Sequence, residues 1–278
     1  MHRSLFVCSF FFIVIAAHSQ YYSDDAFTAR FGVSGGAMNC LTDLGGKSNV
    51  LKTFKPAGGF YVGAFYQRAV GARLELTWGS ITAADRFSKK TGVTERNLSF
   101  SSDITEISLL AEVHPLDFFP AYDLPFSLYL LGGVGSFSFS PKTKIQGGYV
   151  FLQPLHTEGE GFVETGRPNY KLSQFNLPVG GGLSYEISPL FTVKGELVYR
   201  VLSTDYLDDV STTYIDLSLF DKNLPANVAA LAKQLYYRTG EIKSNAPVPT
   251  EKYRGNTIKD SYYSLNVKLE LTLGSTRR

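Results

Sequence analysis

The sequence has few cysteines, few histidines and no long apolar run. Two of its 278 residues are Cys and four are His, and Cys40 is the single cysteine after residue 20. An internal disulfide is therefore excluded for that part of the chain. Gly, Pro or a charge interrupts every later apolar stretch within about ten residues, whereas a membrane-spanning helix needs about twenty. If the chain lies in a membrane, it must cross as a closed β-barrel, because only helices and barrels satisfy every backbone group in lipid.

Glycine and aromatic residues, by contrast, are abundant, with 26 Gly, 17 Tyr and 21 Phe. This composition is typical of curved, amphipathic β-sheet with aromatic girdles. It is also compatible with a soluble all-β domain, so composition alone does not decide. The net charge of +2 gives no indication of a nucleic-acid partner.

The first residues have the three parts of a secretory signal. A positive start precedes an apolar run of about twelve residues, too short to span a membrane, and Ala17-His18-Ser19 forms a small-x-small cleavage site before Gln20. We therefore predict a cleaved signal peptide over residues 1–19 and an exported barrel domain over residues 20–278. The alternative is a membrane anchor that stays attached.

Period-two alternation marks the strands. Within residues 70–78, Val70 and Leu74 lie on one face and Arg73 and Glu75 on the other. Successive side chains of a strand point to opposite faces, so this strand has one apolar side and one charged side. Three further segments repeat the pattern, and four weaker, glycine-rich segments complete a set of eight. The clear segments are 70–78, 106–113, 191–201 and 263–273, and the weaker ones are 27–38, 58–68, 126–140 and 172–186.

The connections between these segments are alternately short and long. Short turns at one end and long loops at the other are typical of outer-membrane barrels, whose long loops lie outside the cell. We therefore predict an all-β fold, an eight-stranded antiparallel up-and-down transmembrane β-barrel in the cell outer membrane. The alternative is a soluble sandwich or lipocalin-like barrel with its apolar faces inward; long apolar faces and aromatics near strand ends favour lipid. The short turns are 67–70, 114–125 and 188–190, and the long loops 39–56, 81–96, 141–171 and 204–260.

The charged faces of the strands predict the barrel interior. Eight strands leave an interior that side chains just fill, and an unpaired buried charge is costly. We therefore expect these charges to pair, to plug the barrel and to fix its register; the alternative is a conducting pore. The residues are Arg73, Glu75, Glu106, Glu112, Lys194, Glu196, Arg200, Lys268 and Glu270.

The last long loop contains a segment of helical spacing. Residues 226–238 carry Val228, Leu231, Ala232 and Leu235 at this spacing, after a Pro that suits a helix start. We predict one short helix in this extracellular loop, with a disordered loop as the alternative.

The sequence offers few candidates for catalytic or metal-binding residues. His114 falls at a periplasmic turn, and His156 falls in an outer loop, where a solvated side chain is expected. The acids Asp205, Asp208 and Asp209 do not have the spacing of a calcium loop. We expect them to be solvated, with calcium binding as the alternative. We predict no enzyme, no catalytic residue and no cofactor.

The turn at 114–125 is longer than strand closure requires. Its apolar residues lie next to prolines that stiffen the chain, so they are suited to contact another protein. The alternative is that they lie in the lipid interface as a girdle. The residues of this possible periplasmic partner contact are Leu116, Phe118, Phe119 and Tyr122.

Several segments together resemble a known family. The YLDDVSTTY and TEG stretches are the more specific of them, and the chain resembles the PorG-like outer-membrane β-barrels associated with type IX secretion. The resemblance implies a non-enzymatic barrel that anchors a periplasmic ring of secretion-system proteins to the outer membrane. The alternative is a barrel for ligand binding, adhesion or transport through its long outer loops. The matching segments are 96–113, 132–142, 153–161, 204–214 and 254–274.

Overall fold

The computed structural model describes residues 27–44, 52–118, 125–145, 147–249, 252–256 and 258–274. The predicted signal peptide lies outside the described residues and stays a prediction. No helix among the described residues is long and apolar enough to span a membrane.

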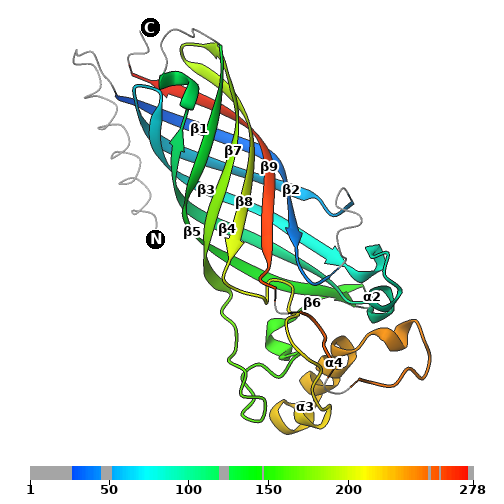
Figure 1. The fold of residues 1–278 in the computed structure, drawn as a ribbon. Helices are drawn as coiled ribbons and strands as arrows, with labels where there is room; N and C mark the ends of the chain where they lie inside the picture. The colour runs from blue at the N-terminus through cyan, green and yellow to red at the C-terminus, as the bar shows by residue number, and fades with distance from the viewer. Residues whose placement is uncertain are drawn as a thin grey trace, which may run out of the picture.

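Eight strands close into an antiparallel barrel (Figure 1). Each strand pairs with its neighbour along the chain, and β9 pairs back to β1 over thirteen residue pairs, from Ala29–Leu273 to Leu41–Ser261. The closure leaves no free edge along the wall, as a lipid environment requires. The predicted fold class is confirmed. The barrel strands are β1 (Phe27–Leu41), β2 (Lys55–Tyr66), β3 (Val70–Ala84), β4 (Ser99–Val113), β5 (Phe126–Ile145), β7 (Ser173–Ser188), β8 (Phe191–Leu202) and β9 (Ser261–Leu273).

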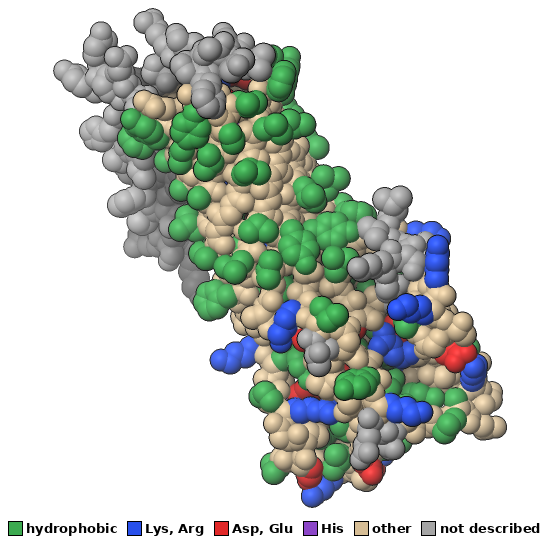
Figure 2. All heavy atoms as spheres, in the orientation of Figure 1, with side chains coloured by type: hydrophobic (Ala, Val, Ile, Leu, Met, Phe, Trp, Pro, Cys, Tyr) green, Lys and Arg blue, Asp and Glu red, His purple; other side chains and the backbone are tan. Residues whose placement is uncertain are grey.

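The two faces of the wall have opposite chemistry. On β3, Leu74 and Trp78 are exposed on the outside, whereas Arg73 and Glu75 are buried inside. Figure 2 shows apolar side chains covering the barrel wall, while charged side chains gather at one end. An apolar exterior around a charged interior is the reverse of a soluble protein and is stable with lipid outside. The soluble sandwich is therefore wrong for this chain.

Aromatic residues mark both rims of the apolar band. Phe27 and Tyr66 lie at the inner rim, with ring centroids 5.0 Å apart, and Trp78, Phe175 and Tyr199 are exposed near the outer rim. Aromatic residues form girdles at the two interfaces of such barrels, where the amphipathic rings of Tyr and Trp lie at the level of the lipid headgroups. On β3, eight residue steps separate Val70 at the inner rim from Trp78 at the outer rim. They span about 27 Å along the strand, which is the length that a tilted strand needs to cross the apolar part of a bilayer.

Two of the inner turns are tight. Between β2 and β3, Gln67 and Arg68 both have positive φ, 46° and 63°, and the Ala69 amide donates to the Tyr66 carbonyl over 3.1 Å. Three residues, 67–69, separate the last strand pair Tyr66–Val70, and positive φ at both central residues of the turn suits the twist of the flanking strands. β7 and β8 join through residues 189–190. The third inner connection contains the short helix η4 (Pro115–Phe118), and its residues 119–124 lie outside the described part.

At the opposite end the long loops fold together rather than projecting separately (Figure 1). Residues 147–172 and 203–260, where described, form what we call the outer cap. It contains β6 (Gly148–Phe151), which pairs with the end of β5, and five of its buried aromatics pack in one core with barrel residues. These aromatics are Phe162, Tyr170, Tyr214, Phe220 and Tyr236.

The predicted helix of the last loop is present as α4 (Ala226–Tyr236). Its buried side chains are Ala229, Ala232, Leu235 and Tyr236. Val228 and Leu231 are partly buried against the same core, so all four predicted residues pack there, and the buried face extends beyond them to Ala229 and Tyr236. The remaining helices are α2 (Thr91–Arg96), α3 (Ser218–Asn223), η3 (Asp85–Phe87), η5 (Gln153–Leu155) and η6 (Thr239–Glu241).

Candidate functional site: the barrel interior and the outer cap

All nine charged residues selected from the sequence point into the barrel, and none is more than 3% exposed. They come from β3, β4, β8 and β9, where alternation places every second side chain inside. The structure joins them into two groups of ion pairs, one toward the inner end and one toward the cap.

Arg73 is the centre of the inner group. Its guanidinium lies 2.6 Å from Glu112, 2.6 Å from Glu196 and 3.0 Å from Glu75. A planar guanidinium offers five donors in a fixed fork, so one Arg can contact three carboxylates. Arg73 thereby links β3, β4 and β8 across the lumen.

Two lysines extend this group around the barrel. Lys268 lies 2.6 Å from Glu75 and 2.8 Å from Glu196, and Lys194 lies 2.7 Å from Glu112 and 2.8 Å from Glu270. The group therefore has as many cations as carboxylates, and its members carry no net charge when all are ionised. They are the cations Arg30, Arg73, Lys194 and Lys268 and the acids Glu75, Glu112, Glu196 and Glu270.

The second group lies nearer the cap. Arg200 contacts Glu106 over 3.0 Å, and the Tyr262 hydroxyl donates to the same carboxylate over 2.7 Å. Arg200 also donates to the Ser264 hydroxyl over 2.5 Å, while Asn176 donates to Tyr262 over 2.8 Å. Each of these charged groups has a neighbour of opposite polarity, as a buried pair requires.

Sequence reasoning missed several interior residues that contact these charges, among them Arg30, Tyr61, Tyr129 and His114. Arg30 pairs with Glu270 over 3.4 Å, and the Tyr61 and Tyr129 hydroxyls donate to interior carboxylates over 2.6 and 3.0 Å. His114, predicted at a periplasmic turn, has its ring inside the barrel, 2.7 Å from Glu112. It continues the inward alternation of β4, and extending that alternation by one residue identifies it.

Glycines make room for these aromatic rings. A side chain at Gly32 would lie 2.2 Å from the Tyr61 ring, and one at Gly182 would lie 2.7 Å from the Tyr129 hydroxyl. The rings in turn lie over the cations, with Lys194 5.0 Å from the Tyr129 centroid and Arg73 5.0 Å from that of Tyr61. Side chains thus fill the lumen at this level.

The acids of the last long loop are buried, not solvated as predicted. Asp205, Asp208 and Asp209 are at most 5% exposed. They accept hydrogen bonds within the cap: Asp205 from the Ser211 hydroxyl, Asp208 from the Val210 amide and Asp209 from the Thr157 hydroxyl, over 2.6–3.0 Å. The bond from the Val210 amide to Asp208 is a local side-chain-to-backbone contact of the kind that fixes loop conformation, and the bond from Thr157 to Asp209 joins the two long loops. The prediction of solvated acids was wrong because it considered this segment without the other parts of the cap that pack against it.

Glu158 ties the two long loops of the cap together. It accepts hydrogen bonds from the amides of Ser211 and Thr212 over 3.0 and 2.7 Å, and the buried Arg254 lies 3.3 Å from it. Arg254 also donates to the Asp209 carbonyl over 2.7 Å. No group of three or more His, Cys, Asp or Glu in the described part of the chain is placed to hold a metal ion.

Burial changes the proton affinity of two cap acids. It raises the pKa of Glu160 to about 8, assisted by the nearby charges of Asp209 and Glu158. Burial likewise raises the pKa of Asp209 to about 6, against the lowering effect of Arg254. A buried carboxyl group favours its neutral form, so these two acids take up protons near neutral pH.

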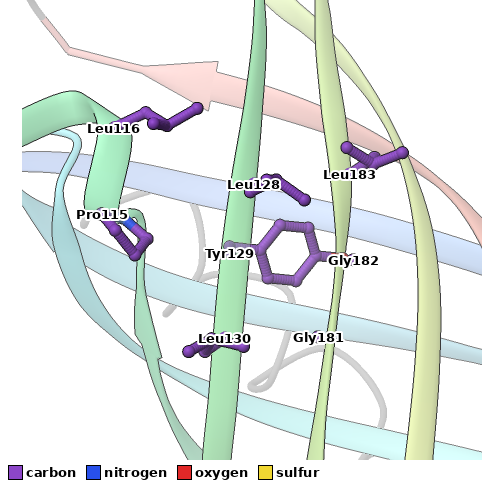
Figure 3. Close-up of a pocket in the computed structure, with 8 residues that line it drawn as sticks. All are labelled: Pro115, Leu116, Leu128, Tyr129, Leu130, Gly181, Gly182 and Leu183. Carbon is purple, nitrogen blue, oxygen red and sulfur yellow. The ribbon is translucent and has the colours of Figure 1, made fainter.

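At the inner end, a hollow of about 470 Å³ lies on the outside of the barrel wall (Figure 3). Pro115 and Leu116 of η4 form one side, and Leu128, Leu130 and Leu183 form the rest around glycines of β7. Leu116 therefore lies against the lipid-facing wall, whereas Phe118 is 54% exposed. Phe119 and Tyr122, the other two residues of the predicted partner contact, lie outside the described residues.

No family model and no curated protein matches the chain. Its fold is similar to several solved structures of outer-membrane proteins. Neisserial surface protein A is 10% identical, with a TM-score of 0.39 over 89% of this chain and 97% of that one. A major outer membrane protein from Thermus thermophilus is 15% identical, with a TM-score of 0.39 over 88% and 99%. The attachment invasion locus protein Ail of Yersinia pestis is 11% identical, with a TM-score of 0.35 over 89% and 97%.

These identities and TM-scores carry no inference about function, and they assign the chain to no specific family. The strand pairing is the evidence for the fold. The apolar wall around a charged lumen is the evidence for the membrane location. The chain is an eight-stranded β-barrel of the cell outer membrane with a folded cap at its outer end.

Proposed function

We propose that this chain is a structural, non-enzymatic barrel that acts through the surfaces at its two ends. The observation that supports this role is the lumen, where a charge-balanced group of ion pairs and aromatic rings fills the space between the strands. Eight-stranded barrels have room for side chains and little else. A solute would have to displace several paired, buried charges to pass.

Conductance across a planar bilayer tests this role. The purified full chain should show no stable single-channel conductance under an applied voltage. A variant with Arg73→Ala, Glu112→Ala and Glu196→Ala, which empties the centre of the inner group, is the positive control for detecting an opening. A reproducible nanosiemens-scale channel in the unmodified protein would show that it transports.

At the inner end, we propose anchoring to a periplasmic ring of type IX secretion proteins. The resemblance of segments 153–161 and 204–214, among others, to the PorG-like barrels supports this proposal. So does η4, where the exposed Phe118 lies beside the apolar residues Pro115 and Leu116. An exposed aromatic on a short, proline-started helix is well suited to bind a partner.

Two double variants test the anchor. Phe118→Ser with Phe119→Ser should leave the barrel folded but abolish recovery of the ring proteins and secretion of cargo. Leu190→Ser with Phe191→Ser removes two exposed apolar residues at another inner turn and should leave both intact. Normal secretion in the first variant would exclude this segment as the anchor, and equal losses in both would indicate a general loss of the apolar rim.

The outer cap supports a second candidate, binding or adhesion at the cell surface. Its two long loops share a buried core and buried hydrogen bonds, so the cap presents a defined surface, as recognition requires. Residues 216–251 can be replaced by a short Gly-Ser linker, because the Arg254 amide donates to the Thr212 carbonyl over 2.7 Å and keeps the ends together. Cells with this variant should keep the barrel but lose adhesion to immobilised polysaccharide; unchanged adhesion would contradict this candidate.

A further inference from the structure

The outward side of the wall changes from apolar to polar beyond the outer aromatic rim. Toward the outer end of β4 and β5, the outward side chains are apolar as far as Ile107 and Val134 and polar from Thr105 and Ser136 onward. The inward side chains change in the opposite sense, since beyond Glu106 they are mostly apolar and belong to the core shared with the cap. These buried apolar residues are Phe100, Ile104, Phe137 and Phe139. This end of the sheet therefore has the polarity of a water-soluble protein and stands outside the membrane.

β6 extends this projecting part of the sheet (Figure 1). It pairs with the end of β5 over four residue pairs and has no partner on its other side among the described strands. Tyr149 and Phe151 of β6 are 63% and 57% exposed, and two residues this far apart on a strand point to the same side. Lys142 connects them with β4, because its Nζ lies 2.5 Å from the Asp103 carboxylate and 5.5 Å from the centroid of the Tyr149 ring. The outward side chains of β4, β5 and β6 thus form one surface.

We call this surface the projecting face, and hydroxyl groups and aromatic rings dominate it. The hydroxyls of Ser101, Ser138 and Ser140 make no hydrogen bond with any described residue. Each hydroxyl is therefore free to donate one hydrogen bond and to accept others. Lys142 neutralises Asp103, so the face has little net charge. The face consists of Ser101, Asp103, Thr105, Ser136, Ser138, Ser140, Lys142, Lys144, Tyr149 and Phe151.

We propose that the projecting face binds an uncharged polysaccharide outside the cell. A sugar ring has C–H groups that pack on flat aromatic rings, and its hydroxyls exchange hydrogen bonds with side-chain hydroxyls. A protein partner fits less well, because serine and lysine are depleted at protein interfaces. A polyanion would need several free cations, whereas Lys144 is the one charge of the face without an ion-pair partner among the described residues.

The arrangement of these groups suits a linear chain of sugars. Tyr149 and Phe151 are two positions apart on β6, so their Cα atoms lie about 7 Å apart along the strand. Ser138 and Ser140 have the same spacing on β5, the strand that pairs with β6 and lies about 5 Å from it. A chain lying along the two strands therefore meets the hydroxyls and then both rings. This inference rests on the second candidate function, adhesion, and it assigns that function to a surface outside residues 216–251.

The test measures binding of the full chain, in nanodiscs free of glycolipid, to three uncharged probes: dextran, mannan and laminarin. The ring variant is Tyr149→Ala with Phe151→Ala, and the hydroxyl variant is Ser138→Ala with Ser140→Ala. The control variant is Tyr253→Ala with Ile258→Ala, which removes two residues that are 76% and 74% exposed. These two residues precede β9, three strands away from β5 around the barrel.

The unmodified protein should bind at least one of the three probes. The ring variant should bind it roughly tenfold more weakly, since each ring loses a stacking contact. The hydroxyl variant should bind it roughly fivefold more weakly through the loss of two hydrogen bonds. The control variant and Lys144→Gln should both stay within about twofold of the unmodified protein.

Several results would overturn the inference. One is equal weakening in the ring and control variants. Another is preference for dextran sulfate over dextran that Lys144→Gln removes, which would identify a polyanion. Displacement of the probe by lipopolysaccharide at lower concentration would identify the glycolipid of the membrane itself. Dimers that depend on the two rings, in place of probe binding, would identify a second copy of the chain.

Two further outcomes separate this inference from the function on which it rests. Adhesion of cells that requires residues 216–251 but neither ring would overturn the inference and leave the adhesion candidate intact. Binding of none of the three probes, together with no adhesion of cells, would overturn both.

Folding of each variant is checked by its faster gel migration without heating. If the ring variant does not fold, hydrogen exchange of the unmodified protein still decides. Bound probe should slow exchange in residues 148–151 and leave residues 253–256 unchanged, and the reverse pattern would overturn the inference.

Discussion

At the scale of single residues, each interior charge has a partner of opposite charge. The contribution of such a pair to the free energy of unfolding can be measured by removing one partner. The pair of Arg200 and Glu106 is the simplest to test, since Glu106 is the one carboxylate that Arg200 contacts among the described residues. Removing one member of a buried pair leaves a charge in a medium that solvates it poorly, whereas removing both does not.

Arg200→Met should therefore lower the free energy of unfolding by about 3–5 kcal/mol. Adding Glu106→Gln should recover part of this loss, giving a coupling energy of about 0.5–3 kcal/mol. Urea-induced unfolding in lipid vesicles measures both. Lys144→Met, at an exposed position, should change stability by less than about 0.5 kcal/mol. Strict additivity of the two interior changes would show that the pair does not act as a unit.

At the scale of elements, each barrel strand has a lipid-facing side whose tolerance of charge depends on depth. On β9, Leu269 lies near the middle of the apolar series and Leu273 at its inner end, and both are exposed on the wall. The two positions share strand, residue type and face, so they differ mainly in depth.

Leu269→Arg should cost about 2–4 kcal/mol of stability in vesicles, and Leu273→Arg only about 0–1 kcal/mol. The reason is that an arginine near the rim extends its guanidinium to the headgroups. Refolding and unfolding titrations in vesicles give both values. Similar costs at the two positions would contradict the assigned position of the bilayer.

The stability of the outer cap should fall as pH rises, whereas a protein that undergoes acid denaturation loses stability as pH falls. Burial raises the pKa of Glu160 to about 8 and that of Asp209 to about 6. Folded groups with raised pKa values bind more protons than the unfolded chain, so their contribution is present at low pH and is lost as pH rises through the folded values. The cap should therefore become less stable between about pH 5 and about pH 8.

Hydrogen exchange of α4, corrected for the intrinsic rate, measures this change. Protection in the cap should decrease as pH rises over this window, while protection in β3 and β4 stays constant. Glu160→Gln keeps the shape of the side chain but cannot ionise, so it should remove the part of the dependence nearest pH 8. A cap that gains protection with rising pH would show that the charged forms are the stable ones.

At the scale of the whole molecule, closure of β9 onto β1 makes the barrel one cooperative unit with an apolar outside. Such a molecule should fractionate with the outer membrane and resist carbonate extraction. Unheated, it should migrate faster on a denaturing gel than after boiling, because the closed barrel stays compact. A variant with Gly32→Trp, which collides with the Tyr61 ring, should lose the fast form. Recovery of the unmodified protein in the soluble periplasmic fraction would contradict the membrane location.

The alternation of apolar and charged side chains determined the strands, their two faces and the barrel. It did so because period two is a local property that each strand carries in its own residues. The interior residues Arg73, Glu112 and Lys268 could be selected in this way.

Only the tertiary structure decided which charges meet and how the long loops fold. Arg73 contacts acids from three strands, and such contacts depend on strand register around a closed circle. The acids of residues 205–209 are buried because Glu158 and Arg254, about fifty residues away on either side, close over them. Loop packing of this kind leaves no periodic signal, since it depends on contacts between segments that are distant along the chain.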